Sequence, residues 1–118
     1  FFLQAEDGID LRLSLVGSEM CIRDRRNRFS IIQDLAGHGI GRHLHESPSH
    51  VPDHSKGKDR RRFQRGMVLT IEPFLSTGPT YAKDTGDGWT LVTAPGYWNA
   101  QFEHTWIITD GEPIVLTL

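Results

Sequence analysis

The chain has one cysteine, no long hydrophobic run and no excess of one sign of charge. Cys21, alone among 118 residues, cannot form an internal disulfide, which excludes the small disulfide-stapled secreted domains. No apolar stretch approaches the roughly 18 residues that a membrane-spanning helix requires. Thirteen Lys and Arg stand against fifteen Asp and Glu, a formal net charge of −2. We therefore expect neither a membrane nor DNA as a partner.

The composition indicates a folded domain. Hydrophobic residues make up 37% of the chain and charged residues 24%, which is typical of globular proteins and not of disordered ones. The length suits one small domain.

Residues 1–25 differ in character from the rest. Glu6, Asp7 and Asp10 interrupt the apolar residues too early for a signal peptide. The run from Leu15 to Arg25 back-translates to DNA that resembles a transposase adapter end, and QAEDGI from Gln4 resembles a flow-cell primer. We therefore predict that residues 1–25 derive from a sequencing adapter, and we leave them out of the reasoning on fold.

Two segments alternate in the manner of strands, residues 67–72 (MVLTIE) and 101–109 (QFEHTWIIT). Alternation places Leu69 and Ile71 on one face of the first, and Thr70 and Glu72 on the other. Shorter patterns predict a strand or helix end at 29–35, a loop at 75–88, and short strands at 89–93 and 113–118. The glycines of 37–41 form a breaker cluster, where the backbone can take positive φ or make close contacts. Residues 42–55 are expected to follow an extended, irregular path.

Five of the six histidines lie within 17 residues: His38, His43, His45, His50 and His54. A lone histidine is usually a surface or packed residue, but a cluster among glycines favours a functional site. The HESPSH stretch is not an H-E-x-x-H zinc motif, because its histidines are five residues apart and Pro48 would break the required helix.

Glu72 and Glu103 lie within the two alternating segments, where glutamate is disfavoured. If both faces of the sheet are solvated, these carboxylates are simply exposed. If they point inward together with a histidine, they suit divalent ions such as Mn, Fe, Co or Zn. The pattern alone leaves both interpretations open.

Four motifs follow in order: GHGIGRHLHESP from Gly37, GMVLTIEP from Gly66, DGWTLVT from Asp87 and AQFEHT from Ala100. Together they resemble the type I methionine aminopeptidases, of the pita-bread metallopeptidase fold, over essentially all of residues 29–117. The resemblance implies an α+β fold of which residues 26–118 are the C-terminal half, a mainly antiparallel curved sheet. It also implies a cytoplasmic enzyme that removes the initiator methionine from the N-termini of nascent polypeptides.

The resemblance implies a centre with two divalent metal ions. Its ligands in this chain are His38, Glu72 and Glu103, with Glu103 bridging both ions and Glu72 also serving as general base or proton shuttle. Two further aspartate ligands belong to the N-terminal half of the fold, and no residue from 26 to 118 replaces them. We therefore expect the chain alone to be inactive.

The resemblance also implies residues that bind the substrate. His45 corresponds to the histidine that hydrogen-bonds the substrate carbonyl, and Leu44 and Trp89 correspond to positions that line the methionine pocket. The segment 53–55 departs from the Pro-Asn pattern common there, which we expect to affect a loop rather than the chemistry.

A basic run extends from Lys56 to Arg65, with a net charge of +5. It is either a solvated loop or a contact with ribosomal RNA, to which phosphate attraction would draw it. Two alternatives to the main interpretation stay open, an Xaa-Pro aminopeptidase or prolidase-like hydrolase and a non-catalytic pita-bread binding protein.

Overall fold

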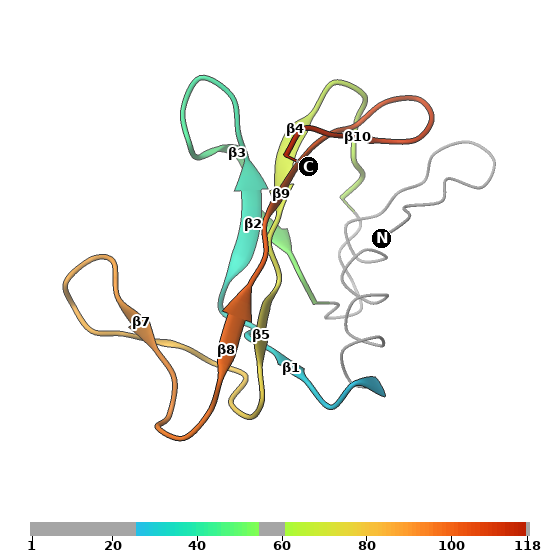
Figure 1. Cartoon of the computed structure of the whole chain (residues 1–118). Helices are drawn as coiled ribbons and strands as arrows, with labels where there is room; N and C mark the ends of the chain where they lie inside the picture. The colour runs from blue at the N-terminus through green and yellow to red at the C-terminus, as the bar shows by residue number, and fades with distance from the viewer. Residues whose placement is uncertain (1–25, 55–60, 118) are drawn as a thin grey trace.

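The computed structural model describes residues 26–54 and 61–117 of the chain. In these ranges it contains ten short strands, which form two main sheets and one hairpin (Figure 1). The strands are β1 (Ser30–Ile31), β2 (Ala36–Gly39), β3 (Glu46–Pro52), β4 (Val68–Ile71), β5 (Phe74–Ser76), β6 (Lys83–Asp84), β7 (Leu91–Val92), β8 (Asn99–Gln101), β9 (His104–Ile107) and β10 (Ile114–Val115).

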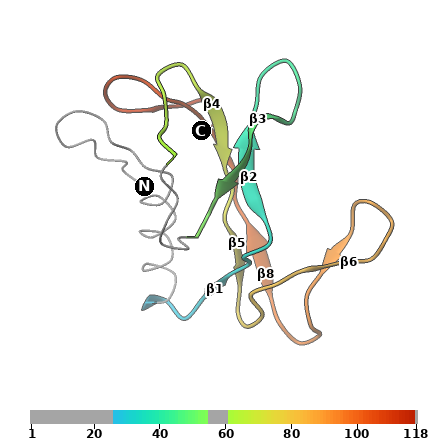
Figure 2. The same ribbon diagram turned by 180° about the vertical axis from the view of Figure 1, so that it is seen from behind.

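The larger sheet has five strands in the order β10-β9-β4-β2-β3, and the smaller has three in the order β1-β5-β8. All paired strands are antiparallel, as predicted. Seen from behind, β1, β5 and β8 continue below β2 and β4, while the β6–β7 hairpin projects to one side (Figure 2). No helix in the described ranges is long and apolar enough to cross a membrane.

The pairing of β4 with β9 separates an apolar face from a polar one. Leu69 lies opposite Trp106, and Thr70 lies opposite Thr105. The core consists of Ile31, Val51, Phe63, Leu69, Ile71, Trp106 and Ile108. Burying a side chain such as Leu69 completely contributes roughly 2 kcal/mol. The predicted apolar face of residues 67–72 is therefore confirmed, since Leu69 and Ile71 belong to the core, and Glu72 continues the face of Thr70.

The prediction of one continuous strand over 101–109 is wrong. Asn99–Gln101 pairs with β5 in the smaller sheet, whereas His104–Ile107 pairs with β4 in the larger one. Phe102 and Glu103 lie between the two strands, where the chain changes partners. We call this point, where the chain passes from the smaller sheet to the larger one, the crease between the sheets. The alternation of side chains continues across the crease, so the sequence pattern does not reveal the change of sheet.

Of the two possibilities predicted for the glycines of 37–41, the close contacts are confirmed, and none of these glycines has a positive φ. They begin in β2, an interior strand between β3 and β4. A Cβ atom on Gly37 would overlap the carbonyl oxygen of Thr70, and one on Gly39 would overlap that of Ser47. Glycine is therefore needed here for close approach of neighbouring backbones rather than for a turn.

Residues 42–55 were expected to be irregular, yet they contain β3, which has seven residues. Pro48 and Pro52 lack a backbone N–H and argue against an interior strand, but β3 lies at the edge of its sheet, where proline is tolerated. The short strands expected at 89–93 and 113–118 appear as β7 and β10, and the loop expected at 75–88 contains the end of β5 and all of β6. The prediction about residues 1–25 lies outside the described residues.

Candidate metal centre

His38, Glu72 and Glu103 come together at the crease between the two sheets. One ligand atom from each lies within 4.8 Å of the other two. His38 belongs to β2, Glu72 follows β4 and Glu103 precedes β9. The register that pairs Ile71 with His104 places Glu72 opposite Glu103 when it is continued by one residue. The sequence pattern left open whether these carboxylates point inward together, and the strand pairing makes them neighbours.

The backbone and ring of His38 are both held by hydrogen bonds. Its backbone N–H donates to Thr70 Oγ1 (2.9 Å), and its ring Nδ1 lies 2.8 Å from the carbonyl oxygen of Gly39. In the neutral tautomer that donates its Nδ1 proton to that carbonyl, Nε2 keeps its lone pair. Nε2 lies 3.4 Å from Glu72 Oε1, so this lone pair faces the carboxylates.

The buried Glu72 carboxylate accepts one hydrogen bond on each oxygen. Thr70 Oγ1 donates to Oε1 (2.9 Å) and Gln101 Nε2 donates to Oε2 (2.9 Å). Burial raises the pKa of Glu72 above its usual value, and the negative charge of Glu103 raises it further. The hydrogen bonds from Thr70 and Gln101, together with His38, act in the opposite direction.

The donor set fits a divalent ion. One imidazole nitrogen and two carboxylates are ligands that zinc, manganese, iron and cobalt accept. The two carboxylates repel each other, so a cation between them would remove an unfavourable interaction. His38 and Glu72 are buried and Glu103 is exposed, which leaves one side of the group open to solvent.

The loop between β2 and β3 presents His45 to this group. The His45 ring lies against the His38 ring, with centroids 4.1 Å apart. Glu46 holds the loop in place, because its Oε1 accepts a hydrogen bond from the backbone N–H of His43 (2.8 Å). A Cβ atom on Gly41 would lie 2.5 Å from Glu46 Oε2, so the carboxylate also packs directly on that glycine.

Leu44 and Trp89, the two predicted pocket residues, are both exposed, at 65% and 91%. Trp89 lies in the β6–β7 hairpin, whose turn is organised by Asp87. Hydrogen bonds from the side chain and backbone of Thr90 and from the backbone of Trp89 hold the pKa of Asp87 below its usual range.

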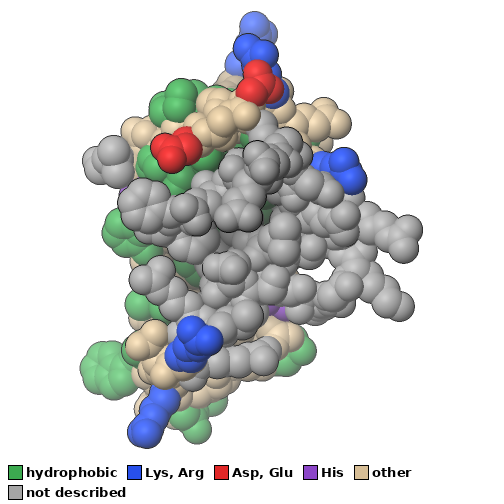
Figure 3. Space-filling view, turned by 90° about the vertical axis from the view of Figure 1, so that its right-hand side faces the viewer, with side chains coloured by type: hydrophobic (Ala, Val, Ile, Leu, Met, Phe, Trp, Pro, Cys, Tyr) green, Lys and Arg blue, Asp and Glu red, His purple; other side chains and the backbone are tan. Residues whose placement is uncertain are grey.

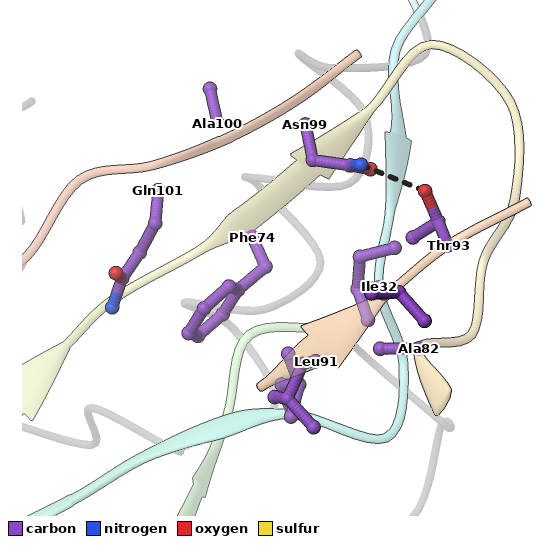
Figure 4. Close-up of a pocket in the computed structure, with 10 residues that line it drawn as sticks. Ile32, Phe74, Ala82, Leu91, Thr93, Asn99, Ala100 and Gln101 are labelled. Carbon is purple, nitrogen blue, oxygen red and sulfur yellow. Dashed lines mark hydrogen bonds between the residues drawn. The ribbon is translucent and has the colours of Figure 1, made fainter. Parts of the chain in front are cut away.

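An open pocket of about 230 Å³ lies between this hairpin and the smaller sheet. Figure 4 shows its apolar side, which includes Ile32, Phe74 and Leu91, and its polar side, where Asn99 Nδ2 donates to Thr93 Oγ1 (2.7 Å). Neither Leu44 nor Trp89 lines this pocket. Their role in binding the methionine side chain stays a prediction.

Asp53 was missed as a residue of this region. We expected the segment 53–55 to affect only a loop, but Asp53 is 1% exposed, and the charge of Glu72 acts on its carboxyl group. Burial, followed by the charge of Glu72, raises its pKa from 3.8 to about 7, while the Glu72 backbone N–H acts in the opposite direction. Among the described residues neither oxygen has a hydrogen bond of ordinary geometry. Nothing in the sequence indicated this burial, because the two prolines of β3 made the segment resemble an irregular loop, where an aspartate is expected to be exposed.

Part of the basic run is engaged within the protein. Arg61 Nη1 donates to the carbonyl oxygen of His50 (3.0 Å), and Arg65 pairs with Asp110 (2.7 Å). Figure 3 shows Lys and Arg side chains at both ends of one face, with acidic side chains beside those at the upper end. Residues 55–60 of the run lie outside the described residues, and a contact with the ribosome stays a prediction.

A histidine and two glutamates gathered on an antiparallel sheet are the arrangement expected of a metal-dependent peptidase. The chain belongs to metallopeptidase family M24, whose model matches residues 12–110. The match includes residues 12–25, which the sequence analysis assigns to an adapter, and that assignment stays a prediction.

Similar proteins carry the name methionine aminopeptidase. The chain is 42% identical over 106 residues to methionine aminopeptidase 2 of Bacillus subtilis and 40% identical over 110 residues to the methionine aminopeptidase of Clostridium perfringens. These alignments cover 90% and 93% of this chain but 43% and 44% of the relatives. The chain thus spans less than half the length of these relatives.

Solved structures of methionine aminopeptidases also match this chain. The crystal structure of methionine aminopeptidase from Thermotoga maritima matches with a TM-score of 0.82 and 37% identity, covering 96% of this chain and 44% of that one. The enzyme from Rickettsia prowazekii also matches with a TM-score of 0.82, at 30% identity, covering 91% of this chain and 43% of that one. The chain therefore has half of the pita-bread fold, as the resemblance implied.

Proposed function

We propose that the whole protein to which this chain corresponds is a metalloaminopeptidase that removes the N-terminal methionine from nascent polypeptides, in the cytoplasm. The observation that carries the proposal is the convergence of His38, Glu72 and Glu103 within 4.8 Å at the crease of the sheets. The relatives named methionine aminopeptidase support the choice of reaction.

The three residues would hold divalent ions, and the proposal includes two ions with Glu103 shared between them. Bound divalent ions lower the pKa of water and polarise the carbonyl of the scissile bond. Two further ligands, the aspartates that the resemblance implies, would come from the part of the fold that the relatives have and this chain does not.

The chain's own side chains would orient the substrate and move the proton. Glu72 would take a proton from the attacking water and pass it to the leaving amine, which is the role of a general base and then a general acid. His45, whose ring lies against His38, would donate a hydrogen bond to the substrate carbonyl. Leu44 and Trp89 would enclose the methionine side chain together with residues of the other half.

Complementation tests the proposal. The 118-residue chain alone is expected not to cleave the peptide Met-Ala-Ser, because a two-ion centre lacks its aspartates. Co-expression with the N-terminal half of the Bacillus subtilis relative should restore turnover in the presence of Co²⁺ or Mn²⁺. Glu103→Ala should then abolish turnover, because one carboxylate serves both ions.

The substrate series separates this function from its rivals. An Xaa-Pro peptidase in the complemented protein would cleave Ala-Pro-Ser and leave Met-Ala-Ser intact. A non-catalytic binding protein would cleave neither peptide although the two halves associate. Turnover of Met-Ala-Ser by the isolated chain would also contradict the proposal, because it would mean that another carboxylate completes the site.

A further inference from the structure

The hydrogen bond between Gln101 and Glu72 joins the two sheets at the metal centre. Gln101 ends β8 in the smaller sheet, and Glu72 follows β4 in the larger one. Pairing of Gln101 with Phe74 sets the position of the Gln101 backbone, since Phe74 lies two residues after Glu72. Figure 4 shows Gln101 on its strand near Phe74. The strand pairing of the smaller sheet therefore places the Gln101 amide within hydrogen-bonding distance of the Glu72 carboxylate.

Each oxygen of Glu72 has a different protein donor. Thr70, which is completely buried, donates to Oε1, and Gln101 donates to Oε2. The last torsion of a glutamate side chain is broad and roughly two-fold, so a carboxylate with a single donor can turn. The second donor, Gln101, removes that freedom and leaves each oxygen a further lone pair for a ligand.

An amide is a suitable donor for this position. A Lys or Arg at position 101 would also donate to Glu72, but its positive charge would repel a cation bound beside it. A neutral amide orients the carboxylate without repelling the cation. Groups that orient metal ligands in this manner change metal affinity by 10- to 100-fold in other proteins.

We propose that Gln101 is a positioning residue that holds the Glu72 carboxylate in the orientation needed to bind a divalent ion. The inference rests on the proposed function, since it requires that His38, Glu72 and Glu103 bind such an ion. It concerns a residue that does not itself contact the ion.

Titration of the metal-free 118-residue chain with Co²⁺ tests the inference. Binding is followed by calorimetry and by the visible absorption of Co²⁺, and the melting temperature of each metal-free variant is measured. Gln101→Met keeps the length and shape of the side chain and removes the donor. Gln64→Met makes the same change at an exposed glutamine in the loop before β4 and serves as the matched control. Glu103→Ala removes a ligand.

Gln101→Met should weaken Co²⁺ binding about tenfold and alter the absorption spectrum of the bound Co²⁺. Its metal-free form should melt somewhat earlier than the parent chain, because Glu72 loses a donor, but should be fully folded at the temperature of the titration. Gln64→Met should bind as the parent does. If Gln101→Met binds as the parent chain while Glu103→Ala loses binding, the metal centre stands and the role of Gln101 is overturned. Unfolding of metal-free Gln101→Met at the temperature of the titration, in step with its weaker binding, would also overturn it, in favour of a purely structural role. If Glu103→Ala binds as well as the parent chain, the three-residue centre itself is refuted.

Discussion

Replacing Asp53 by asparagine should make the stability of the chain much less dependent on pH. Asp53 is 1% exposed and its pKa is raised from 3.8 to about 7, first by burial and then by the charge of Glu72. The folded state therefore binds the Asp53 proton more tightly than the unfolded state does. Ionisation of this carboxyl destabilises the folded chain as the pH rises from about 4 to about 7, and the full loss is present above pH 7.

The size of the effect follows from the two pKa values. A rise from 3.8 to about 7 corresponds to about 4 kcal/mol of unfolding free energy. Asparagine has nearly the shape of protonated aspartic acid and does not ionise. The two chains should thus be about equally stable near pH 4, and Asp53→Asn should be more stable by up to about 4 kcal/mol near pH 8.

Urea unfolding in EDTA, followed by tryptophan fluorescence between about pH 4 and about pH 8, measures this difference. EDTA is needed because a bound cation would offset the charges of Glu72 and Asp53. Groups that titrate in both proteins cancel in the comparison to a first approximation. Asp84→Asn, at an exposed carboxylate in β6, is the control, and because it keeps Asp53 its stability should follow the same dependence on pH as that of the parent chain. A constant stability difference between Asp53→Asn and the parent across this range would refute the reasoning, because it would mean that Asp53 ionises as it does in the unfolded chain.

Three further predictions concern the residues that surround the candidate metal centre and the basic run. Gly37→Ala should destabilise the chain by about 1–3 kcal/mol, because the added methyl group meets the carbonyl oxygen of Thr70, whereas Gly111→Ala, which has open space around it, should be neutral in the same urea titration. Glu46→Ala should release the loop that carries His45, which would be seen as faster hydrogen exchange at the His43 amide and as loss of the NOE between the His45 and His38 rings. Retention of that NOE would contradict the role given to Glu46. Changing Arg60, Arg61 and Arg62 to Glu should weaken ribosome association of the complemented enzyme and leave peptide cleavage in solution unchanged. Equal ribosome affinity would favour a solvated loop.

The candidate ligands could be proposed from the sequence, and so could the faces on which the side chains of residues 67–72 lie. Alternation is a local property with a period of two, so Thr70 and Glu72 share a face whatever partner β4 acquires. The order and spacing of the four motifs led to the family, and the family match agrees. The roles of His38, Glu72 and Glu103 as ligands stay proposals, since they were inferred from the resemblance and the present structure supplies their convergence alone.

Other features depend on partners that are distant in the sequence. Gln101 reaches Glu72 across 29 residues, and it does so because β8 and β9 pair with different strands, although their sequence reads as one strand. The sequence left open whether the glycines of β2 allow a positive φ or a close contact, because the Thr70 and Ser47 backbones that approach them belong to the neighbouring strands. Asp53 reads as a loop residue because burial is decided by what the fold lays over it. Local patterns specify which way a side chain points, whereas the register of the sheets decides what that side chain meets.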